Sequence, residues 1–354
     1  MFTGSQVTTN FVAGDVSRAQ GLEWLADGSI DIAFGTQALI QKDVAFHSLG
    51  IAVVDEQHRF GVEQRVVMRD KHPGDEVPDL LLMTATPIPR TLAMTLYGDL
   101  KVSVIDEMPP GRSPVPTEAV SDSDDEAIDK AILDAVGEGR QVFVVCPLVE
   151  DSDKIEARSA ATEFARVRSS LPTVRTELLH GQMLSRDKSD VMHRFRAGEI
   201  DVLVATTVIE VGIDVPNATL MVIRTADRFG LSQLHQLRGR VGRGAFGGRC
   251  VLSADPTTPD GERRIEAMVS STDGFALAEV DLEIRGQGTV FGGTQSGAAD
   301  LRLGNILKDR ELLEAASTVA IEAVADDPNG PLVSEVMHEV AVLFGESAEW
   351  LTRS

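Results

Sequence analysis

The chain has 354 residues, of which 43% are hydrophobic and 25% charged, and this length accommodates two domains of ordinary globular composition. No apolar run approaches the roughly 20 residues that cross a bilayer, and the first residues lack a basic segment followed by an apolar core, so we predict a cytoplasmic protein without a membrane partner. The net charge of −22 disfavours nucleic acid as a partner, but the arginines gathered in residues 224–249 leave a local exception open.

The first hundred residues alternate between short apolar runs and helical segments. We predict a weak helix over residues 20–25 and strands over residues 30–34, 51–54 and 80–83. Strands that alternate with helices form a parallel sheet in an α/β domain. The proline-dense residues 109–116 then predict a semi-rigid linker.

The same alternation restarts after the linker and predicts a second α/β domain. Strands are expected over residues 141–146, 175–179, 202–205, 220–223 and 249–252, with helices over residues 125–136, 151–169, 186–197 and 233–240. From residue 261 the pattern changes to helices over residues 262–270, 274–284, 299–324 and 332–344, with a glycine-rich loop at residues 285–297. Cys146 and Cys250 lie in apolar stretches and fit neither a disulfide nor a metal pattern, so we expect buried thiols in a reducing compartment.

Two adjacent acids, Asp55 and Glu56, end the apolar run of residues 51–54. Such a run predicts a buried parallel strand whose carboxyl end opens onto a ligand crevice. There, one carboxylate can hold Mg²⁺ and the other can orient or deprotonate an attacking water. The alternative is an acidic turn at the end of a strand, and for the pair alone we would favour that alternative.

A distant arginine-rich segment, residues 236–243 (QLRGRVGR), favours the catalytic interpretation. On a helix Gln236 and Arg240 are four residues apart on one face, with Arg243 three residues further on. The guanidinium groups of Arg240 and Arg243 are therefore candidate arginine fingers for a transferring phosphoryl group. The alternative is a solvated basic helix.

Residues 205–216 (ATTVIEVGIDVP) start at the last residue of a predicted buried strand, which two threonines follow. The hydroxyl and N–H groups of Thr206 and Thr207 can contact a nucleic-acid phosphate. Gly212 permits close approach of the backbone, and Asp214 can contact either the nucleotide or the arginines. An ordinary turn at a strand end is the less favoured alternative.

These strings resemble, in order, the motifs of superfamily 2 helicases. Gly35-Thr36-Gln37 is similar to motif Ib, Asp55-Glu56-Gln57-His58 to motif II, Thr84-Ala85-Thr86 to motif III, residues 139–148 to motif IV, residues 205–216 to motif V and residues 236–244 to motif VI. The resemblance implies ATP and Mg²⁺ as cofactors, with Asp55 holding the metal and Glu56 positioning water. It places Gln57 and His58 beside the γ-phosphate. Thr84 and Thr86 are implied to couple the lobes, although a capped strand-end turn is the alternative there.

Residues 55–64 (DEQHRFGVEQ) are especially similar to the RecG family, ATP-dependent DNA helicases that remodel branched DNA. Transcription-repair coupling factors share much of this pattern but typically have glutamate at the position of Gln57. Residues 275–286 and 295–297 resemble the translocation motif of both families, with Thr294 where an arginine is typical. The resemblance implies a functional monomer acting on forked duplex DNA in recombination, repair and stalled-fork processing. It implies DNA contacts at Gly35, Thr36, Thr206, Thr207, Arg285 and Gln295.

The Walker A pattern Gly-x-x-x-x-Gly-Lys-Ser/Thr occurs nowhere in the sequence, and the family's wedge domain is missing. We therefore expect the C-terminal part of such a helicase, which alone binds and hydrolyses ATP poorly. Its predicted fold is α/β, with two RecA-like parallel-sheet lobes, the first truncated, and a small helical C-terminal region. The expected domains are a partial first lobe (1–108), a linker (109–118), a second lobe (119–260), and a helical hairpin with the translocation loop and C-terminal helices (261–354).

Truncation predicts that the first lobe leaves a strand edge unpaired and apolar surface uncovered. Three alternatives to the helicase remain: a non-catalytic DNA-binding or partner-binding module, a translocase related to the coupling factor, and an unrelated P-loop-type metabolic enzyme. The coupling-factor alternative would need a domain that binds RNA polymerase, for which we find no segment. The metabolic enzyme does not account for residues 236–243.

Overall fold

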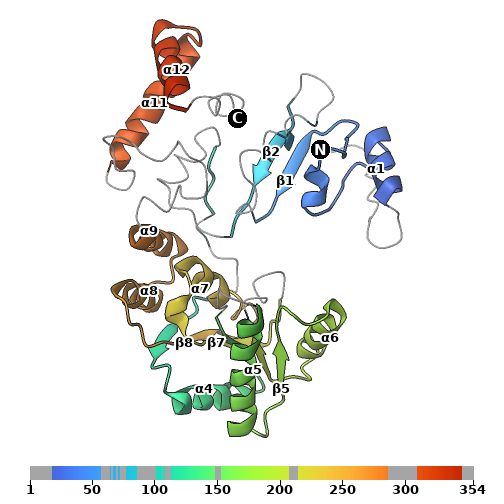
Figure 1. The fold of residues 1–354 in the computed structure, drawn as a ribbon, viewed down its shortest axis with the longest axis vertical. Coiled ribbons are helices and arrows are strands. Elements are labelled where there is room, and N and C mark those ends of the chain that lie inside the picture. Colours follow the sequence, from blue (N-terminus) through green and yellow to red (C-terminus); the bar gives the residue numbers. More distant parts are fainter. Residues whose placement is uncertain are drawn as a thin grey trace. The chain divides into compact units, whose positions relative to one another are not determined.

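The computed structural model describes residues 18–56, 64, 67–68, 71, 77–85, 101–105, 107, 113–147, 153–206, 214–285 and 309–344 (Figure 1). The chain divides into two units: Met1–Thr86 with Ala315–Ser354, and Pro87–Glu314. In the described part of the chain, every helix is too short or too polar to span a bilayer.

Unit 1 contains a small parallel sheet of β1 (Ile51–Val54) and β2 (Asp79–Leu82), preceded by α1 (Arg18–Asp27) and the short 3-10 helix η1 (Gln37–Ile40). Ala52 lies opposite Leu80 and Val54 opposite Leu82. These side chains pack with Ile40 and Met68 on one face of the sheet.

The other face of this sheet is apolar and open. Ile51, Val53 and Leu81 point to it, because side chains alternate along a strand, and they are 60%, 54% and 49% exposed. Parallel sheets are normally covered on both faces. Among the described residues β1 and β2 pair only with each other. Within the described residues, the structure agrees with the predicted unpaired edge and uncovered apolar surface.

Residues 30–34 form no strand, although their apolar alternation predicts one. A strand needs a neighbour to accept and donate its backbone hydrogen bonds. None of the described strands pairs with this segment, and Phe34 is 74% exposed. The prediction of a strand at this position is therefore wrong for the structure described.

Two helices, α11 (Arg310–Asp326) and α12 (Pro331–Phe344), end the described chain. Asp327 organises the turn between them, since its side chain accepts the Asn329 N–H at 3.1 Å and its carbonyl accepts the Gly330 N–H at 3.0 Å. The second helix matches its predicted range within a residue. The first ten residues of the predicted helix 299–324 lie outside the described residues.

Unit 2 is built on a six-stranded sheet in which all strands are parallel. The spatial order is β3 (Thr117–Val120), β8 (Arg249–Ser253), β7 (Ala218–Ile223), β4 (Gln141–Val145), β6 (Val202–Ala205) and β5 (Thr176–Leu179). Five of these strands were predicted to within two residues. The short strand β3 was not predicted and begins inside the segment expected to be a linker.

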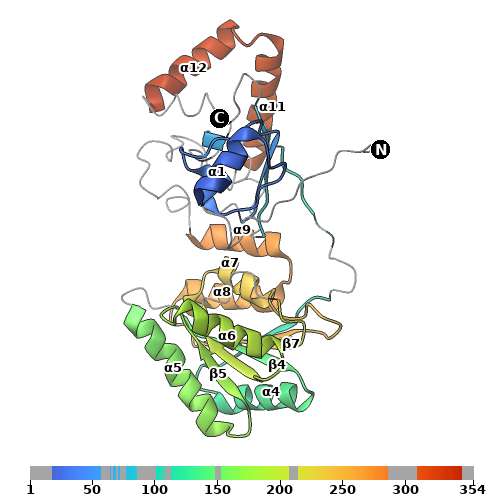
Figure 2. The same ribbon diagram turned by 90° about the vertical axis from the view of Figure 1, so that its right-hand side faces the viewer.

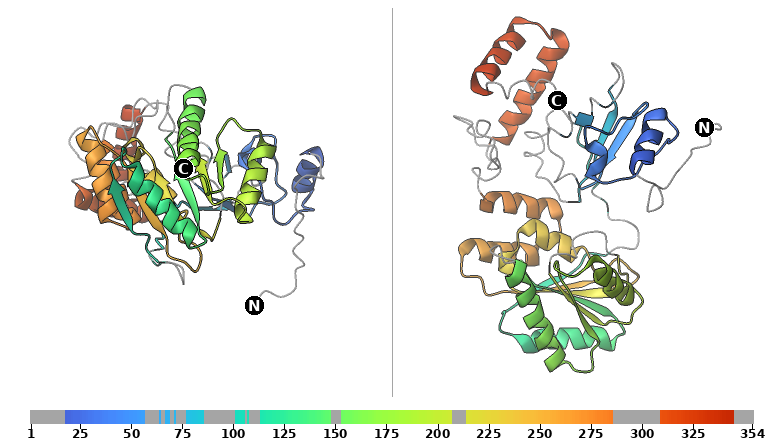
Figure 3. Two further views of the ribbon diagram at one scale, coloured as in Figure 1. Left: turned by 90° about the horizontal axis from the view of Figure 1, so that it is seen from below. Right: turned by 45° about the vertical axis from the view of Figure 1, so that its right-hand side comes forward.

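Helices cover both faces of this sheet (Figures 2 and 3). α4 (Asp125–Gly137) and α5 (Asp153–Ser170) pack on the face that carries Val142, Val144 and Val204. α6 (Ser185–Arg196) and α7 (Leu231–Arg238) pack on the opposite face, together with α8 (Pro259–Ser270) and α9 (Gly274–Arg285). Burial on both faces explains why the central strands have continuous apolar sequences.

Local sequence signals fix where two of these helices begin. The Asp124 carboxylate accepts the Ala127 N–H at 3.1 Å and caps α4. The Thr258 hydroxyl accepts the Gly261 N–H at 3.1 Å, and Pro259 follows at the first helical position of α8. Both caps satisfy N–H groups that have no partner inside the helix.

Candidate functional site

Asp55 and Glu56 lie directly after β1, at the carboxyl end of the strand. The Asp55 carboxylate accepts the backbone N–H of Glu56 at 2.9 Å. Glu56 has a φ of +55°, in the left-handed region that residues other than glycine enter at a cost of about 1–2 kcal/mol. Such conformations cluster at active sites and ligand clamps. The backbone therefore supports the functional interpretation of this acidic pair.

Thr84 lies at the same edge of the small sheet as the acidic pair. The Met83 N–H donates to the Val54 carbonyl at 2.8 Å, so the parallel ladder continues past the end of β2. Thr84 follows Met83 and comes level with the residues after β1. The backbone of Thr84 thus follows the strand beside the one that ends at the acidic pair, and its coupling role stays a prediction.

Gly35 and Thr36 precede η1. The Thr36 hydroxyl accepts the Ala38 N–H at 3.4 Å, and a Cβ at Gly35 would lie 2.7 Å from the side chain of Leu39. Lys71 holds the loop that follows, because its ammonium group donates to the carbonyls of Gln41 at 2.8 Å and Val44 at 2.6 Å. Burial lowers the pKa of Lys71. The backbone at the predicted motif Ib is therefore held in place.

The arginines of motif VI follow α7 rather than lying on it. α7 ends at Arg238, two residues before Arg240, and Gly242 has a φ of +69°. The prediction that Gln236, Arg240 and Arg243 share one helical face is therefore wrong. The Arg240 N–H donates to the Leu237 carbonyl at 2.9 Å, so a tight turn, and not a further helical turn, positions its side chain.

Arg243 contacts Asp214 of motif V. Its Nε donates to the Gly239 carbonyl at 2.9 Å, and its Nη1 lies 3.9 Å from the Asp214 carboxylate. The Arg243 side chain is 32% exposed and that of Asp214 62% exposed. The structure contains the contact between Asp214 and an arginine, and contact of Asp214 with the nucleotide stays a prediction.

Thr206 follows β6 and is fully buried. Its N–H donates to the Leu179 carbonyl at 3.3 Å, while its hydroxyl has no hydrogen-bond partner among the described residues. A buried hydroxyl does not face a DNA backbone, so a contact with phosphate at this strand end falls to Thr207, for which it stays a prediction.

Several predicted site residues lie outside the described residues. They are Gln57, His58, Thr86, Thr207, Gly212 and Gln295. Arg285 is the last residue of α9, and its side chain is not among those described. The roles expected for these residues stay predictions.

Arg238 has a structural role that the sequence analysis missed. It is 3% exposed, and its Nη1 donates to the carbonyls of Met268 at 3.1 Å and Ser271 at 2.8 Å, at the end of α8. Burial lowers its pKa. Its position was a signal, because Leu231, Leu234 and Arg238 recur at the spacing of one buried helical face.

A cluster of charged side chains joins α4 and α5 to the carboxyl end of the sheet of unit 2. Arg166 lies 2.8 Å from Asp129 and 2.9 Å from Glu163, and Arg224 lies 3.1 Å from Asp125. Arg224 also donates to the Asp122 carbonyl at 3.0 Å. Three acids of the run of residues 122–129, Asp122, Asp125 and Asp129, thus pair with arginines distant in sequence.

The chain was compared with protein families and with known proteins. Residues 125–245 match the helicase conserved C-terminal domain, and residues 271–344 match the C-terminal part of domain 3 of the ATP-dependent DNA helicase RecG. The chain is 45% identical over 333 residues to the ATP-dependent DNA helicase RecG of Pasteurella multocida. It is 48% identical over 325 residues to that of Mycobacterium bovis. The chain belongs to the RecG family.

The match covers 92% of this chain but 48% of the Pasteurella RecG, and 88% of this chain but 44% of the Mycobacterium RecG. The chain therefore spans about half the length of the RecG relatives it matches. A solved structure of RecG bound to a three-way DNA junction is 39% identical, with a TM-score of 0.62, and covers 84% of this chain and 38% of the RecG chain. The predicted RecA-like α/β fold class and the predicted family are confirmed.

Proposed function

We propose that this chain is part of an ATP-dependent DNA helicase that translocates on branched duplex DNA in the cytoplasm. One observation carries the proposal: identity of 45–48% to RecG helicases along about nine tenths of the chain. The RecG structure with a three-way junction supports branched DNA as the substrate class. Recombination, repair and the rescue of stalled forks are processes that present such DNA, and we propose a functional monomer.

We assign nucleotide chemistry to two groups of side chains. Adjacent carboxylates suit Mg²⁺, which binds hard oxygen ligands and is usually held by one or two carboxylates. One Asp55 oxygen is engaged by the Glu56 N–H, which orients the carboxylate. Asp55 would hold the metal, which when bound neutralises charge on the phosphates, and Glu56 would orient or deprotonate the attacking water. Gln57 and His58 would report the γ-phosphate.

Arg240 and Arg243, with Gln236, are proposed to act on nucleotide phosphates. The separation of 3.9 Å between Arg243 and Asp214 describes a weak pair, and both side chains are partly exposed. A phosphate can therefore replace Asp214 as the partner of Arg243 at little cost. Asp214 would hold the guanidinium ready and, with Gly212, border the nucleotide.

DNA binding is assigned to the predicted contact residues on both units. Gly35 and Thr36 sit at a rigid turn before η1, where backbone N–H groups are fixed in place. Thr206 is left out because it is buried, and Thr207, which follows it, is retained. Arg285 and Gln295 belong to the expected translocation motif. We also propose the domain division into residues 1–108, 109–118, 119–260 and 261–354.

A chimera tests the proposal. The part of the Mycobacterium bovis RecG that this chain does not match would be joined ahead of residue 1, and ATP hydrolysis would be measured with three-way junction DNA. We expect hydrolysis that depends on the junction and falls at least about a hundredfold in Glu56→Gln and Arg243→Ala. A folded chimera whose Glu56→Gln variant retains full hydrolysis would reject the assignment.

The absence of a Walker A pattern from the 354 residues favours a second candidate, a non-catalytic DNA-binding module. The purified chain separates the two. As a module it would bind junction DNA with an affinity that neither ATP nor Glu56→Gln changes. As part of a helicase, it would hydrolyse ATP poorly alone and would gain hydrolysis only in the chimera.

A further inference from the structure

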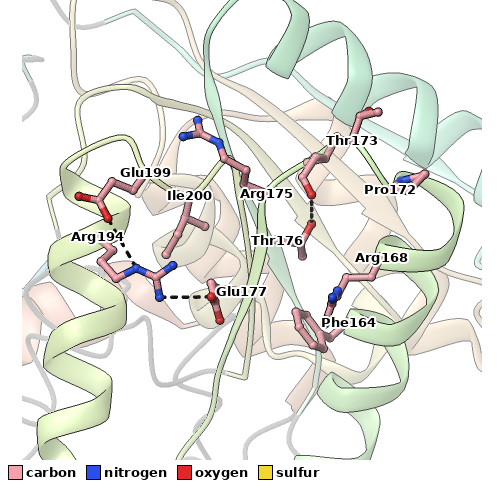
Figure 4. Close-up of a pocket in the computed structure, with 11 residues that line it drawn as sticks. Phe164, Arg168, Pro172, Thr173, Arg175, Thr176, Glu177, Arg194, Glu199 and Ile200 are labelled. Carbon is pink, nitrogen blue, oxygen red and sulfur yellow. Dashed lines mark hydrogen bonds and ion pairs between the residues drawn. The ribbon is translucent and has the colours of Figure 1, made fainter.

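The outer edge of the sheet in unit 2 borders a hollow that none of the functions above uses. β5 is the last strand of the sheet, so one of its edges has no neighbouring strand among the described residues. The hollow has a volume of about 530 Å³ and is lined by the beginning of β5, the end of α5 and the end of α6 (Figure 4). This volume lies within the range of ligand sites.

The backbone of β5 carries N–H and C=O groups that point away from β6, and Thr176 among these residues lines the hollow. The carbonyls of Arg175 and Leu179 accept hydrogen bonds from the residues that flank β6, at 2.8 Å from the Asp201 N–H and 3.3 Å from the Thr206 N–H. Along a parallel strand, the N–H and C=O of one residue both point to the neighbouring strand on one side, and those of the next residue both point to the other side. Those of Thr176 and Leu178 therefore point away from β6, to the open edge. An extended segment can add there as a further strand.

The two sides of the edge differ in charge (Figure 4). On the side of α6, Arg194 is already engaged, by Glu177 at 3.2 Å and Glu199 at 3.6 Å. On the side of α5, the Arg168 guanidinium lies 5.4 Å from the centre of the Phe164 ring, and among the described residues it has no acidic partner within 4.0 Å.

Arg175, the third arginine of the hollow, is also engaged. It forms an ion pair with Asp201, with a nitrogen–oxygen distance of 2.9 Å at Nε. Arg168 is therefore the arginine of the hollow that can take an external carboxylate. The lining carries three arginines and two glutamates, although the whole chain carries −22.

We propose that the β5 edge is a docking site for an extended acidic segment of a partner protein. The segment adds as a seventh strand through the outward N–H and C=O groups of Thr176 and Leu178. Because side chains alternate along a strand, acids at every second position all lie on the α5 side, beside Arg168. The backbone hydrogen bonds of the added strand supply affinity, and Arg168, beside Phe164, favours acidic over basic side chains in the segment.

The probe is a fluorescein-labelled peptide, Gly-Thr-Glu-Thr-Glu-Thr-Glu-Thr-Gly, titrated with the whole chain at low salt. Threonine favours extended backbone. The matched control peptide carries lysine in place of glutamate. We expect saturable binding of the glutamate peptide and at least about tenfold weaker binding of the lysine peptide. The overall negative charge of the protein would favour the opposite order, so the comparison isolates the local site.

Two variants locate the binding. Arg168→Glu should weaken the glutamate peptide at least about fivefold, whereas Arg186→Glu, the same charge change at an exposed position at the start of α6, should not. Thr176→Pro removes an outward N–H and should weaken the binding of both peptides.

If that variant fails to fold, amide hydrogen exchange of the unmodified chain replaces it. The peptide should slow exchange at Thr176 and Leu178 and leave Glu177, whose N–H points to β6, unchanged.

The proposal is overturned by any of three results. The first is no saturable binding of the glutamate peptide up to about 1 mM. The second is binding whose affinity Arg168→Glu leaves unchanged. The third is binding that leaves amide exchange at Thr176 and Leu178 unchanged.

Discussion

The Asp122 carboxylate holds Thr225 in a left-handed conformation. Thr225 has φ and ψ of +49° and +49°, and Asp122 accepts its N–H at 3.2 Å and its hydroxyl at 3.3 Å. A branched side chain enters this region only when its surroundings impose the strain. Asp122 also accepts the Ser253 hydroxyl at 2.5 Å. One carboxylate therefore fixes the start of the segment that leads from β7 into α7.

Replacing Asp122 should destabilise unit 2. In Asp122→Ala the Thr225 N–H and the Ser253 hydroxyl lose their acceptor, and Arg224 loses part of its neutralisation. We expect the free energy of unfolding to fall by about 3 kcal/mol in urea denaturation. Asp260→Ala, an acid in the first turn of α8, should cost less than about 1 kcal/mol. Adding Thr225→Gly should recover part of the loss in Asp122→Ala, since glycine removes the strain. Equal losses in Asp122→Ala and Asp260→Ala would contradict this account.

Gln141 should be a stability determinant of the sheet. Its side-chain amide is buried and donates to the carbonyls of Phe195 at 2.6 Å and Ile200 at 2.8 Å, which joins β4 to the end of α6 and to the chain that follows it. Gln141→Leu keeps the volume but leaves two buried carbonyls without this donor. We expect a loss of about 2–4 kcal/mol in the free energy of unfolding, measured in urea. A change below about 0.5 kcal/mol would show that water replaces the amide.

Arg238 should hold the end of α8. In Arg238→Met the carbonyls of Met268 and Ser271 lose their donor, so amide exchange should accelerate in α8 and at the start of α9. We expect a loss of about 2–4 kcal/mol in stability. Arg228→Met, at an exposed arginine between β7 and α7, is the matched control. It should change neither the amide exchange nor the free energy of unfolding. Unchanged amide exchange in α8 would show that Arg238 does not hold the end of this helix.

Both thiols should be unreactive in the folded chain. Burial raises the pKa of Cys146 and of Cys250 to about 12, so at pH 8 almost no thiolate forms. Alkylation by iodoacetamide should be at least about a thousandfold slower than in guanidinium chloride. The raised pKa values also set the direction in which pH changes stability. The contribution of the buried neutral thiols to the free energy of unfolding is complete below the ordinary thiol pKa and declines as pH rises towards 12. Rapid alkylation of either thiol in native buffer would contradict the burial.

The sequence predicted most of unit 2 because its strands are buried on both faces and so have uninterrupted apolar sequences. It missed β3, a half-buried edge strand of four residues directly after a proline-rich segment. It placed the end of α7 two residues too late, because the basic pattern continues past Gly239 while the helix does not. At the candidate site it placed Asp55 and Glu56 at a strand end, as observed.

The charged cluster and Arg238 depend on partners that the sequence does not bring together. Arg224 and Asp125 are 99 residues apart, and Arg238 meets Ser271 across 33 residues. No local pattern encodes such pairs. The left-handed backbone of Glu56 was equally invisible, since periodicity reports burial and not φ.

The open face of the β1–β2 sheet makes the two units unequal in cohesion. A sheet of two strands with a small core is marginal in isolation, whereas six strands covered by helices on both faces are not. We therefore expect more than one thermal unfolding transition, in which the unit that carries Asp55 and Glu56 unfolds at a lower temperature than the unit that carries Arg240 and Arg243.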